Sequence, residues 1–127
     1  MSPFIGRFDD IGQDGMSLVR NIISVYQYSD GHVEVLAASV RSFGHFLCSI
    51  KYGADIVTAP LKILKQWKEN SMFIPDEVWQ YNLNNLAAIL YQPVSLDKQW
   101  SEYNIQHDLT DRGLEKFTSD WNNLIKV

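Results

Sequence analysis

The stretch from Val33 to Pro60 reads VEVLAASVRSFGHFLCSIKYGADIVTAP and has the pattern of a strand–helix–strand unit. Two short apolar runs, VEVLAAS and ADIVTAP, flank about fifteen residues with helical spacing that end at Gly53. Parallel strands that are covered on both faces form nearly continuous apolar runs, as these do. Polar residues follow each run, at the carboxyl edge where α/β folds carry their sites. The stretch therefore indicates an α/β fold and makes that edge the candidate site.

The residues before this stretch predict one more strand and helix. The segment SPFIGRF predicts a first strand at about residues 3–8. Asp14 or Gly15 then begins a helix, and Ser29-Asp30-Gly31 ends it. A second strand follows at residues 32–39. The order strand, helix, strand is again that of a crossover unit.

Helix caps and a proline organise the next part of the chain. Ser42 predicts the N-cap of a helix that runs to Tyr52, with Gly53 as its C-cap. A third strand is expected at residues 55–58, and Pro60 begins a helix over residues 61–69, because proline suits the first helical turn. Residues 1–69 therefore contain three βα units in a row.

The remainder of the chain has a different composition. Residues 70–109 are rich in aromatics and broken by prolines, which predicts an extended, partly helical connection with short helices at about 76–80 and 83–90. Residues 110–127 predict a final helix that Thr110 caps and that packs on the α/β part. One face of this helix carries Leu114, Phe117, Trp121, Leu124 and Ile125.

Composition excludes several classes of function. With 127 residues and 46% hydrophobic residues, the chain is long enough for one ordinary domain with a core. A net charge of −4 gives no reason to expect a nucleic acid as a partner. No apolar run approaches the ~20 residues of a membrane span, and the N-terminus lacks the features of a signal peptide. A soluble, cytoplasmic protein is expected.

The cysteine and the histidines do not predict a metal site. Cys48 is the single cysteine, so no internal disulfide is possible, and its apolar surroundings favour a small core residue over a nucleophile. His32, His45 and His107 lack metal-ligand spacing. We interpret His45 and His107 as surface or capping groups, and we expect no metal.

Three parallel strands leave two open sheet edges, which is not a stable arrangement by itself. TIM-type barrels remove both edges with eight strands and ~250 residues. Met1 lies almost inside the predicted first strand, so the chain reads like the end of a larger (β/α)8 barrel. The open edges predict either self-association or a complementary N-terminal half.

Four segments resemble the C-terminal part of the transaldolase and fructose-6-phosphate aldolase family. In chain order they are SPFIGRFDD, LAASVRS, GADIVTAPLKIL and LTDRGLEKFTSDW. The resemblance implies that the three predicted strands are the sixth, seventh and eighth strands of the barrel. The fold class is therefore α/β, a partial TIM barrel made of the last three βα units and a C-terminal helical segment.

The resemblance also implies an activity. Family members transfer or cleave a three-carbon dihydroxyacetone unit between sugar phosphates, through a Schiff base on a lysine of the fourth strand and without a cofactor. No lysine of this chain falls on a predicted strand. We therefore expect no catalytic residue here, and a chain that is inactive alone: a C-terminal fragment of an enzyme of pentose phosphate metabolism.

The phosphate-binding groups implied by the resemblance are Arg7, Ser39 and Arg41. Arginine offers a planar fork of donors that matches phosphate, and serine adds a hydroxyl. The resemblance further implies that Phe4 and Asp9 face the substrate. The plainer alternatives stay open at this stage: an ion pair of Arg7 with a neighbouring aspartate, a strand-ending Ser39 and a solvated Arg41.

Two other functions stay open. A separate N-terminal chain that completes the barrel would restore the lysine and give an active enzyme. Alternatively, the chain is a sugar-phosphate-binding module without catalysis. The residues do not indicate which sugar phosphate is bound.

Overall fold

The computed structural model describes residues 1–27, 31–83, 85–95 and 97–125. The chain divides into two compact units, Met1–Gln92 and Pro93–Val127, and each is described by itself.

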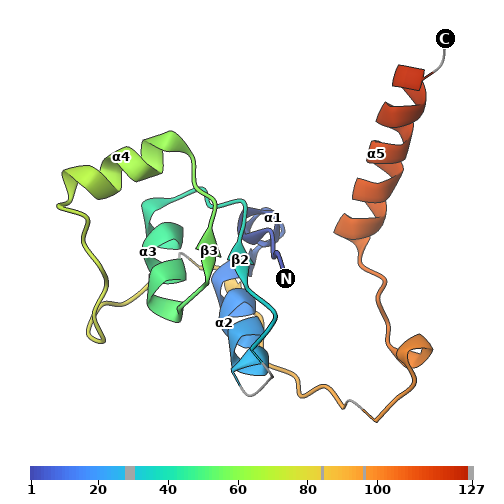
Figure 1. Ribbon diagram of the computed structural model, residues 1–127, viewed down its shortest axis with the longest axis horizontal. Helices are drawn as coiled ribbons and strands as arrows, with labels where there is room; N and C mark the ends of the chain where they lie inside the picture. Colours follow the sequence, from blue (N-terminus) through green and yellow to red (C-terminus); the bar gives the residue numbers. More distant parts are fainter. Residues whose placement is uncertain (28–30, 84, 96, 126–127) are drawn as a thin grey trace. The chain divides into compact units, whose positions relative to one another are not determined.

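Parallel extended segments form the centre of the first unit. Strand β2 (Leu36–Ala37) pairs in parallel with β3 (Ile56–Val57), and Phe4 forms a parallel bridge to Ala38 on the other side of β2 (Figure 1). Backbone hydrogen bonds extend this second pairing over residues 1–6. The segment around β2 is therefore the middle of a parallel arrangement, as the sequence predicts. Within the described ranges these segments do not close into a barrel.

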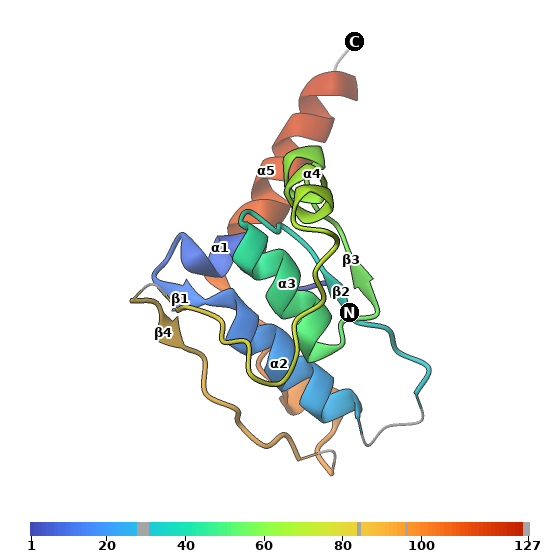
Figure 2. The same ribbon diagram turned by 90° about the vertical axis from the view of Figure 1, so that its left-hand side faces the viewer.

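Helices alternate with these segments and carry most of the core. They are α2 (Gly15–Tyr26), α3 (Phe43–Tyr52) and α4 (Leu61–Glu69), and Figure 2 shows α2 and α3 lying side by side. The buried apolar cluster comprises Ile5, Met16, Val19, Val35, Ala37, Val40, Phe46, Leu47, Cys48 and Ile63. The predicted mixture of helix and strand is confirmed, and so is the prediction that Cys48 is a core residue.

The bounds of α3 and α4 agree with the sequence prediction because local groups set them. The Ser42 hydroxyl accepts a hydrogen bond from the backbone N–H of His45 at 3.0 Å, which satisfies a free donor of the first turn. Gly53 ends α3 in the left-handed region at φ 78°. Pro60 directly precedes α4. Each of these signals acts within a few residues, so the sequence contains it in full.

Asp14 caps α2, as expected. Its carboxylate accepts hydrogen bonds from the backbone N–H groups of Met16 at 3.1 Å and Ser17 at 2.9 Å. The helix ends at Tyr26. Two of the three residues predicted to end it, Ser29 and Asp30, lie outside the described residues.

The prediction of a strand over residues 3–8 is wrong from Ile5 onward, where a short helix, α1 (Ile5–Asp9), begins. The N–H groups of the first two helical residues still continue the ladder, and that of Gly6 donates to the Ser39 carbonyl at 3.2 Å. The apolar pattern is that of a strand, but the helical turn lets Ile5 stay buried while the chain doubles back toward α2. That reversal depends on tertiary contacts that no local pattern contains.

The two short helices predicted at about 76–80 and 83–90 do not form in the described residues. Residues 73–83 and 85–92, here called the strap, run instead as an extended segment along α2 and α3 (Figure 2). Strand β4 (Ala87–Ala88) pairs in parallel with β1 (Gln13–Asp14). The backbone groups of the strap form hydrogen bonds with distant residues of the same unit. These hydrogen bonds replace the ones that a local helix would form.

Side chains of α2 and α3 hold the strap. The ammonium of Lys51 donates to the carbonyl oxygens of Glu77, at 3.1 Å, and Trp79. The amide of Asn21 donates to the Ile89 carbonyl at 2.8 Å, and the Ile89 N–H donates to the Ser17 hydroxyl, also at 2.8 Å. These distant partners explain why helical spacing in this part of the sequence is misleading.

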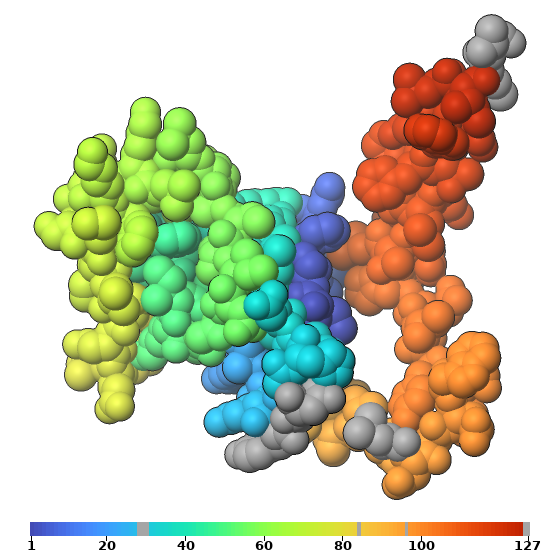
Figure 3. Space-filling model, in the orientation of Figure 1, coloured from blue at the N-terminus to red at the C-terminus, as the bar shows by residue number. Residues whose placement is uncertain are grey.

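The second unit contains a 3-10 turn, η1 (Trp100–Glu102), and the long helix α5 (Asp108–Ile125). The helix begins two residues before the predicted cap Thr110. His107 takes that role, because its Nδ1 accepts from the Leu109 N–H at 3.3 Å. Within the second unit, the apolar residues predicted to share one face of α5 are exposed: Leu114, Phe117, Trp121, Leu124 and Ile125. Figure 3 shows this helix in red. No helix in the described part of the chain is long and apolar enough to cross a membrane.

Candidate functional site at the strand ends

Arg41 and Asp10 form a bidentate ion pair at the carboxyl edge of the parallel segments. Nη2 of Arg41 donates to Oδ2 of Asp10 at 2.8 Å, and Nη1 donates to Oδ1. These hydrogen bonds, and the positive charges of Arg41 and Arg7, lower the pKa of the Asp10 carboxyl. The aspartate partner that sequence reasoning considered for Arg7 is thus held by Arg41. The guanidinium of Arg41 therefore lies at the predicted edge, but it is paired with the carboxylate of Asp10.

Gly6 makes room for this arginine. A Cβ atom on Gly6 would lie 2.6 Å from Cδ of Arg41 and 2.8 Å from the carbonyl oxygen of Ser39. Real Cβ atoms do not approach other atoms so closely, so any side chain here would displace Arg41 or the backbone after β2. The absence of a side chain at Gly6 is therefore a condition for the position of the arginine.

Ser39 lies two residues before Arg41 on the same segment, and Arg7 lies in α1 beside it. Ser39 adopts φ 58°, a left-handed conformation that is uncommon outside glycine and that turns the chain at the end of β2. Arg7 is exposed in the last turn of α1, directly after the Gly6 that bonds to the Ser39 carbonyl. The three residues of the predicted phosphate site thus lie on adjacent segments at one edge.

Phe4 and Asp9 have opposite surroundings. Pro3 and Ile5 are buried, whereas the side chain of Phe4 is 58% exposed, so it points to the other face of the extended segment. Both carboxylate oxygens of Asp9 are engaged within the fold. Oδ1 accepts from the Gly15 N–H at 3.2 Å, and Oδ2 lies 2.9 Å from Nε2 of His45.

His45 is the residue at this edge whose surroundings the sequence pattern did not indicate. The sequence predicts this residue at the surface or as a cap, but the structure buries it, with only 5% of the residue exposed. Nδ1 accepts from the backbone N–H of Arg41 at 3.4 Å, while Nε2 faces Asp9. The apolar neighbours in FGHFL were the available signal, because a polar residue on an apolar helix face needs buried partners. Those partners are distant in sequence, so the pattern alone could not name them.

Burial lowers the pKa of His45, against the opposing effect of the Asp9 charge. We expect the free energy of unfolding to be highest above pH 6.5 and to fall as the pH decreases below it. The reason is that His45 binds a proton in the unfolded chain, at its ordinary pKa of 6.5, before it does so in the folded chain. One such group contributes at most about 1.4 kcal/mol per pH unit.

This expectation is checked by urea unfolding between pH 5 and 7.5. In His45→Gln, which has no titrating ring, the slope in this window should be smaller than in the parent chain. Equal slopes in both proteins would show that His45 does not carry the pH dependence.

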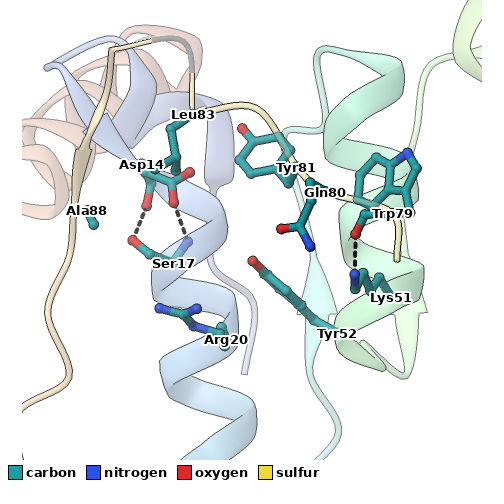
Figure 4. A pocket seen from close by; sticks show the side chains of 10 residues that line it. All are labelled: Asp14, Ser17, Arg20, Lys51, Tyr52, Trp79, Gln80, Tyr81, Leu83 and Ala88. Carbon is teal, nitrogen blue, oxygen red and sulfur yellow. Dashed lines mark hydrogen bonds between the residues drawn. The ribbon is translucent and has the colours of Figure 1, made fainter. Parts of the chain in front are cut away.

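The first unit also contains a cavity of about 350 Å³ between α2, α3 and the strap (Figure 4). Its charged groups already serve the fold. Asp14 caps α2, Lys51 holds the strap carbonyls, and the Arg20 guanidinium lies over the ring of Tyr52 at 6.0 Å. The cavity therefore lies beneath the strap, and the three charged side chains that line it have structural partners.

Cys48 and the acidic residues do not define another chemical centre. Burial raises the pKa of the Cys48 thiol to about 11, which leaves it unreactive at neutral pH. Among the residues that the structure describes, no group of three or more His, Cys, Asp and Glu side chains could hold a metal ion.

The chain is thus an α/β protein whose parallel segments present arginine and serine at their carboxyl ends. It belongs to the transaldolase/fructose-6-phosphate aldolase family, whose model matches residues 1–127. The resemblance found in the four sequence segments is confirmed.

Individual relatives agree with this assignment. A probable transaldolase of Alkaliphilus metalliredigens is 35% identical over 126 residues, which are 99% of this chain and 42% of the relative. One of Exiguobacterium is 34% identical over 123 residues, or 97% of this chain and 40% of the relative. A third, of Parabacteroides distasonis, is 49% identical over 65 residues, or 51% of this chain and 30% of the relative. The chain therefore spans about two fifths of the length of the first two of these curated relatives.

Proposed function

We propose that this chain supplies the phosphate-binding edge of a transaldolase-like enzyme of sugar-phosphate metabolism. In this proposal residues 1–69 are the last three βα units of the barrel, residues 70–109 connect them to the final helix, and residues 110–127 pack on the barrel. The observation that carries it is the fork of Arg41, held beside Ser39 at the strand ends of a chain that belongs to this family.

The catalytic lysine of the complete reaction is not among the residues that we assign to the site. A Schiff-base lysine needs a desolvated pocket in which its pKa falls. Within the described ranges, no lysine lies on a strand, and Lys126 falls outside them. The lysines on helices or in turns are Lys51, Lys62, Lys65, Lys68, Lys98 and Lys116. The chain alone is therefore proposed to be inactive.

Phosphate binding requires that Arg41 exchange Asp10 for the ligand. The arginine then donates two hydrogen bonds to phosphate oxygens, while Ser39 contributes from the same segment and Arg7 from α1. Asp10 competes with the ligand for the same donors. The proposal therefore makes opposite predictions for the two members of the ion pair.

We expect Arg41→Gln to weaken the binding of inorganic phosphate by roughly tenfold to a hundredfold, because charge-assisted hydrogen bonds are lost. Asp10→Asn should strengthen it by about two- to fivefold, the contribution of an exposed ion pair. Isothermal titration and ³¹P NMR measure both affinities. Arg20→Gln is the control, because Arg20 lies over Tyr52 beside the strap cavity. Parent-like affinity in Arg41→Gln would exclude Arg41 from the site.

The uncovered sheet supports a complementary partner. Parallel strands are normally covered on both faces and at both edges. Here Phe4 is 58% exposed and Ile56 is 41% exposed, so apolar side chains remain on the uncovered face. We propose that five further βα units, the part of the relatives that this chain does not match, cover this face. Self-association of the chain is the alternative way to cover it.

Borohydride trapping separates the two functional alternatives. The chain is mixed with the N-terminal part of the Alkaliphilus relative and a ketose phosphate, and the reduced adduct is located by mass spectrometry. A Schiff base on the added N-terminal part supports an enzyme assembled in trans. Phosphate-ester affinity without an adduct or turnover supports a binding module, and an adduct on this chain would overturn our assignment.

The exposed apolar face of α5 supports its proposed packing on the barrel of the complete enzyme. Side chains such as Phe117 and Trp121 are exposed within the second unit. An apolar stripe of this width is typical of a helix that packs against another surface.

A further inference from the structure

We infer that Asp9 and His45 form a positioning pair that holds the backbone of residues 39–41, and with it the guanidinium of Arg41, in its place at the strand ends. The inference rests on the proposed phosphate site. It assigns to the buried His45 and the partly buried Asp9 a role that neither the composition nor the motifs of the sequence indicate.

The pair connects three elements around the loop. His45 belongs to α3, and its Nδ1 accepts from the Arg41 N–H at 3.4 Å. Asp9 belongs to α1 and lies 2.9 Å from Nε2 of the same ring. The second oxygen of Asp9 accepts from the N–H of Gly15, the first residue of α2, at 3.2 Å. A shift of the His45 ring would therefore move the loop of residues 39–41 relative to α1 and α2.

The arrangement requires one tautomer of His45. Nδ1 faces a donor, so it must be unprotonated, and the proton is on Nε2, where Asp9 accepts it. A carboxylate opposite Nε2 selects this tautomer because it is only an acceptor. The burial of the ring favours the neutral form and therefore leaves Nδ1 free to accept from Arg41.

Other charged and titratable groups also face His45. The Asp14 charge at the start of α2 favours protonation of the ring, the Arg41 charge opposes it, and the ring of Tyr81 on the strap lies 6.1 Å from the imidazole ring. The carboxylate of Asp9 is the group that lies within hydrogen-bonding distance of Nε2, at 2.9 Å. The pair therefore consists of Asp9 and His45, with the other groups as its surroundings.

Asp9→Asn tests the tautomer. The new amide meets two donors, the Gly15 N–H and the Nε2–H of His45, with a single acceptor oxygen. If that oxygen bonds to Gly15, the amide N–H₂ faces Nε2 and drives the proton to Nδ1, opposite the Arg41 N–H. This is the tautomer effect of the equivalent change in serine proteases. We expect a changed His45 tautomer in ¹⁵N NMR, faster hydrogen exchange of the Arg41 amide, and roughly five- to tenfold weaker binding of inorganic phosphate.

Two changes at His45 form a matched pair for the same 127-residue chain. In His45→Asn the amide oxygen lies near the place of Nδ1 and can still accept from Arg41, whereas His45→Gln reaches the place of Nε2 and leaves the Arg41 N–H without its acceptor. Both lose one partner, so thermal unfolding should be affected similarly. We expect phosphate affinity to fall roughly five- to tenfold in His45→Gln and less than about threefold in His45→Asn.

The outcomes separate this inference from the proposed function. In a parent chain that binds phosphate, equal phosphate affinity in the two His45 variants would overturn the positioning role, and so would an unchanged Arg41 amide in Asp9→Asn. A parent chain that has the expected tautomer and a protected Arg41 amide, but no phosphate affinity, would overturn the phosphate site and leave the positioning pair supported.

Discussion

The Ile63→Ala variant is expected to unfold with a free energy lower than that of the parent by about 2–5 kcal/mol, the range for truncation of a buried aliphatic side chain. Ile63 is 2% exposed and is the buried residue of α4, so it anchors this helix to the core. The change removes buried methyl groups and leaves a cavity. Because small domains are stable by only about 5–15 kcal/mol, this loss is a large part of the total.

Leu61→Ala is the matched control for this prediction. Leu61 lies two residues earlier in the same helix and is 67% exposed. Its truncation should change the free energy of unfolding by no more than about 0.5 kcal/mol. Urea unfolding followed by circular dichroism measures both variants. Equal losses would mean that α4 is not attached through Ile63, and a changed m-value would point to altered compactness instead.

Gly15→Ala is expected to cost about 1–3 kcal/mol, as overpacking usually does. A Cβ atom at this position would lie 2.7 Å from Cα and 2.8 Å from the carbonyl carbon of Ile5. These are backbone atoms of α1, which cannot move aside as the end of a flexible side chain can. The α1 segment, and with it Asp9, would have to shift. The change should therefore weaken phosphate binding in addition to lowering stability.

Gly44→Ala provides the comparison, because both glycines lie in the first turn of a helix. A Cβ atom on Gly44 would have its nearest neighbour, an atom of the Tyr81 ring, at 3.6 Å, which is an ordinary contact. Alanine should then stabilise α3 by up to about 1 kcal/mol through its helix propensity. Thermal and urea unfolding distinguish the two outcomes. A Gly15→Ala variant as stable as Gly44→Ala would contradict the close approach of α1 and α2.

The elements that sequence reasoning placed correctly are those with local signals. Ser42 and Gly53 delimit α3, Asp14 caps α2, and Pro60 precedes α4. Each acts through backbone groups within a turn of itself. The misplaced elements, α1 and the strap, form their hydrogen bonds with residues far away in the chain. The backbone N–H of Ile89, for example, donates to the hydroxyl of Ser17, which is 72 residues away.

In the candidate site, too, the positions of residues along the chain were predictable, whereas their pairing across the fold was not. The family resemblance located Arg7, Ser39 and Arg41 at the strand ends, and the structure has them on adjacent segments there. It did not indicate that Asp10 occupies the Arg41 fork, or that His45 is buried beside Asp9. Both are pairings between groups on different elements, and a linear pattern contains no information about which charge meets which.

Caps, periodicity and motifs are properties of neighbouring residues, so the amino-acid sequence was enough to predict the α/β class, the parallel apolar runs, the bounds of α3 and α4, and the family. Three features could be seen only in the folded chain: the helical turn that begins at Ile5, the extended strap, and the meeting of Asp9, His45 and Arg41 at one edge. These features depend on contacts across the fold, where burial makes an unpaired polar group costly and so selects the partners.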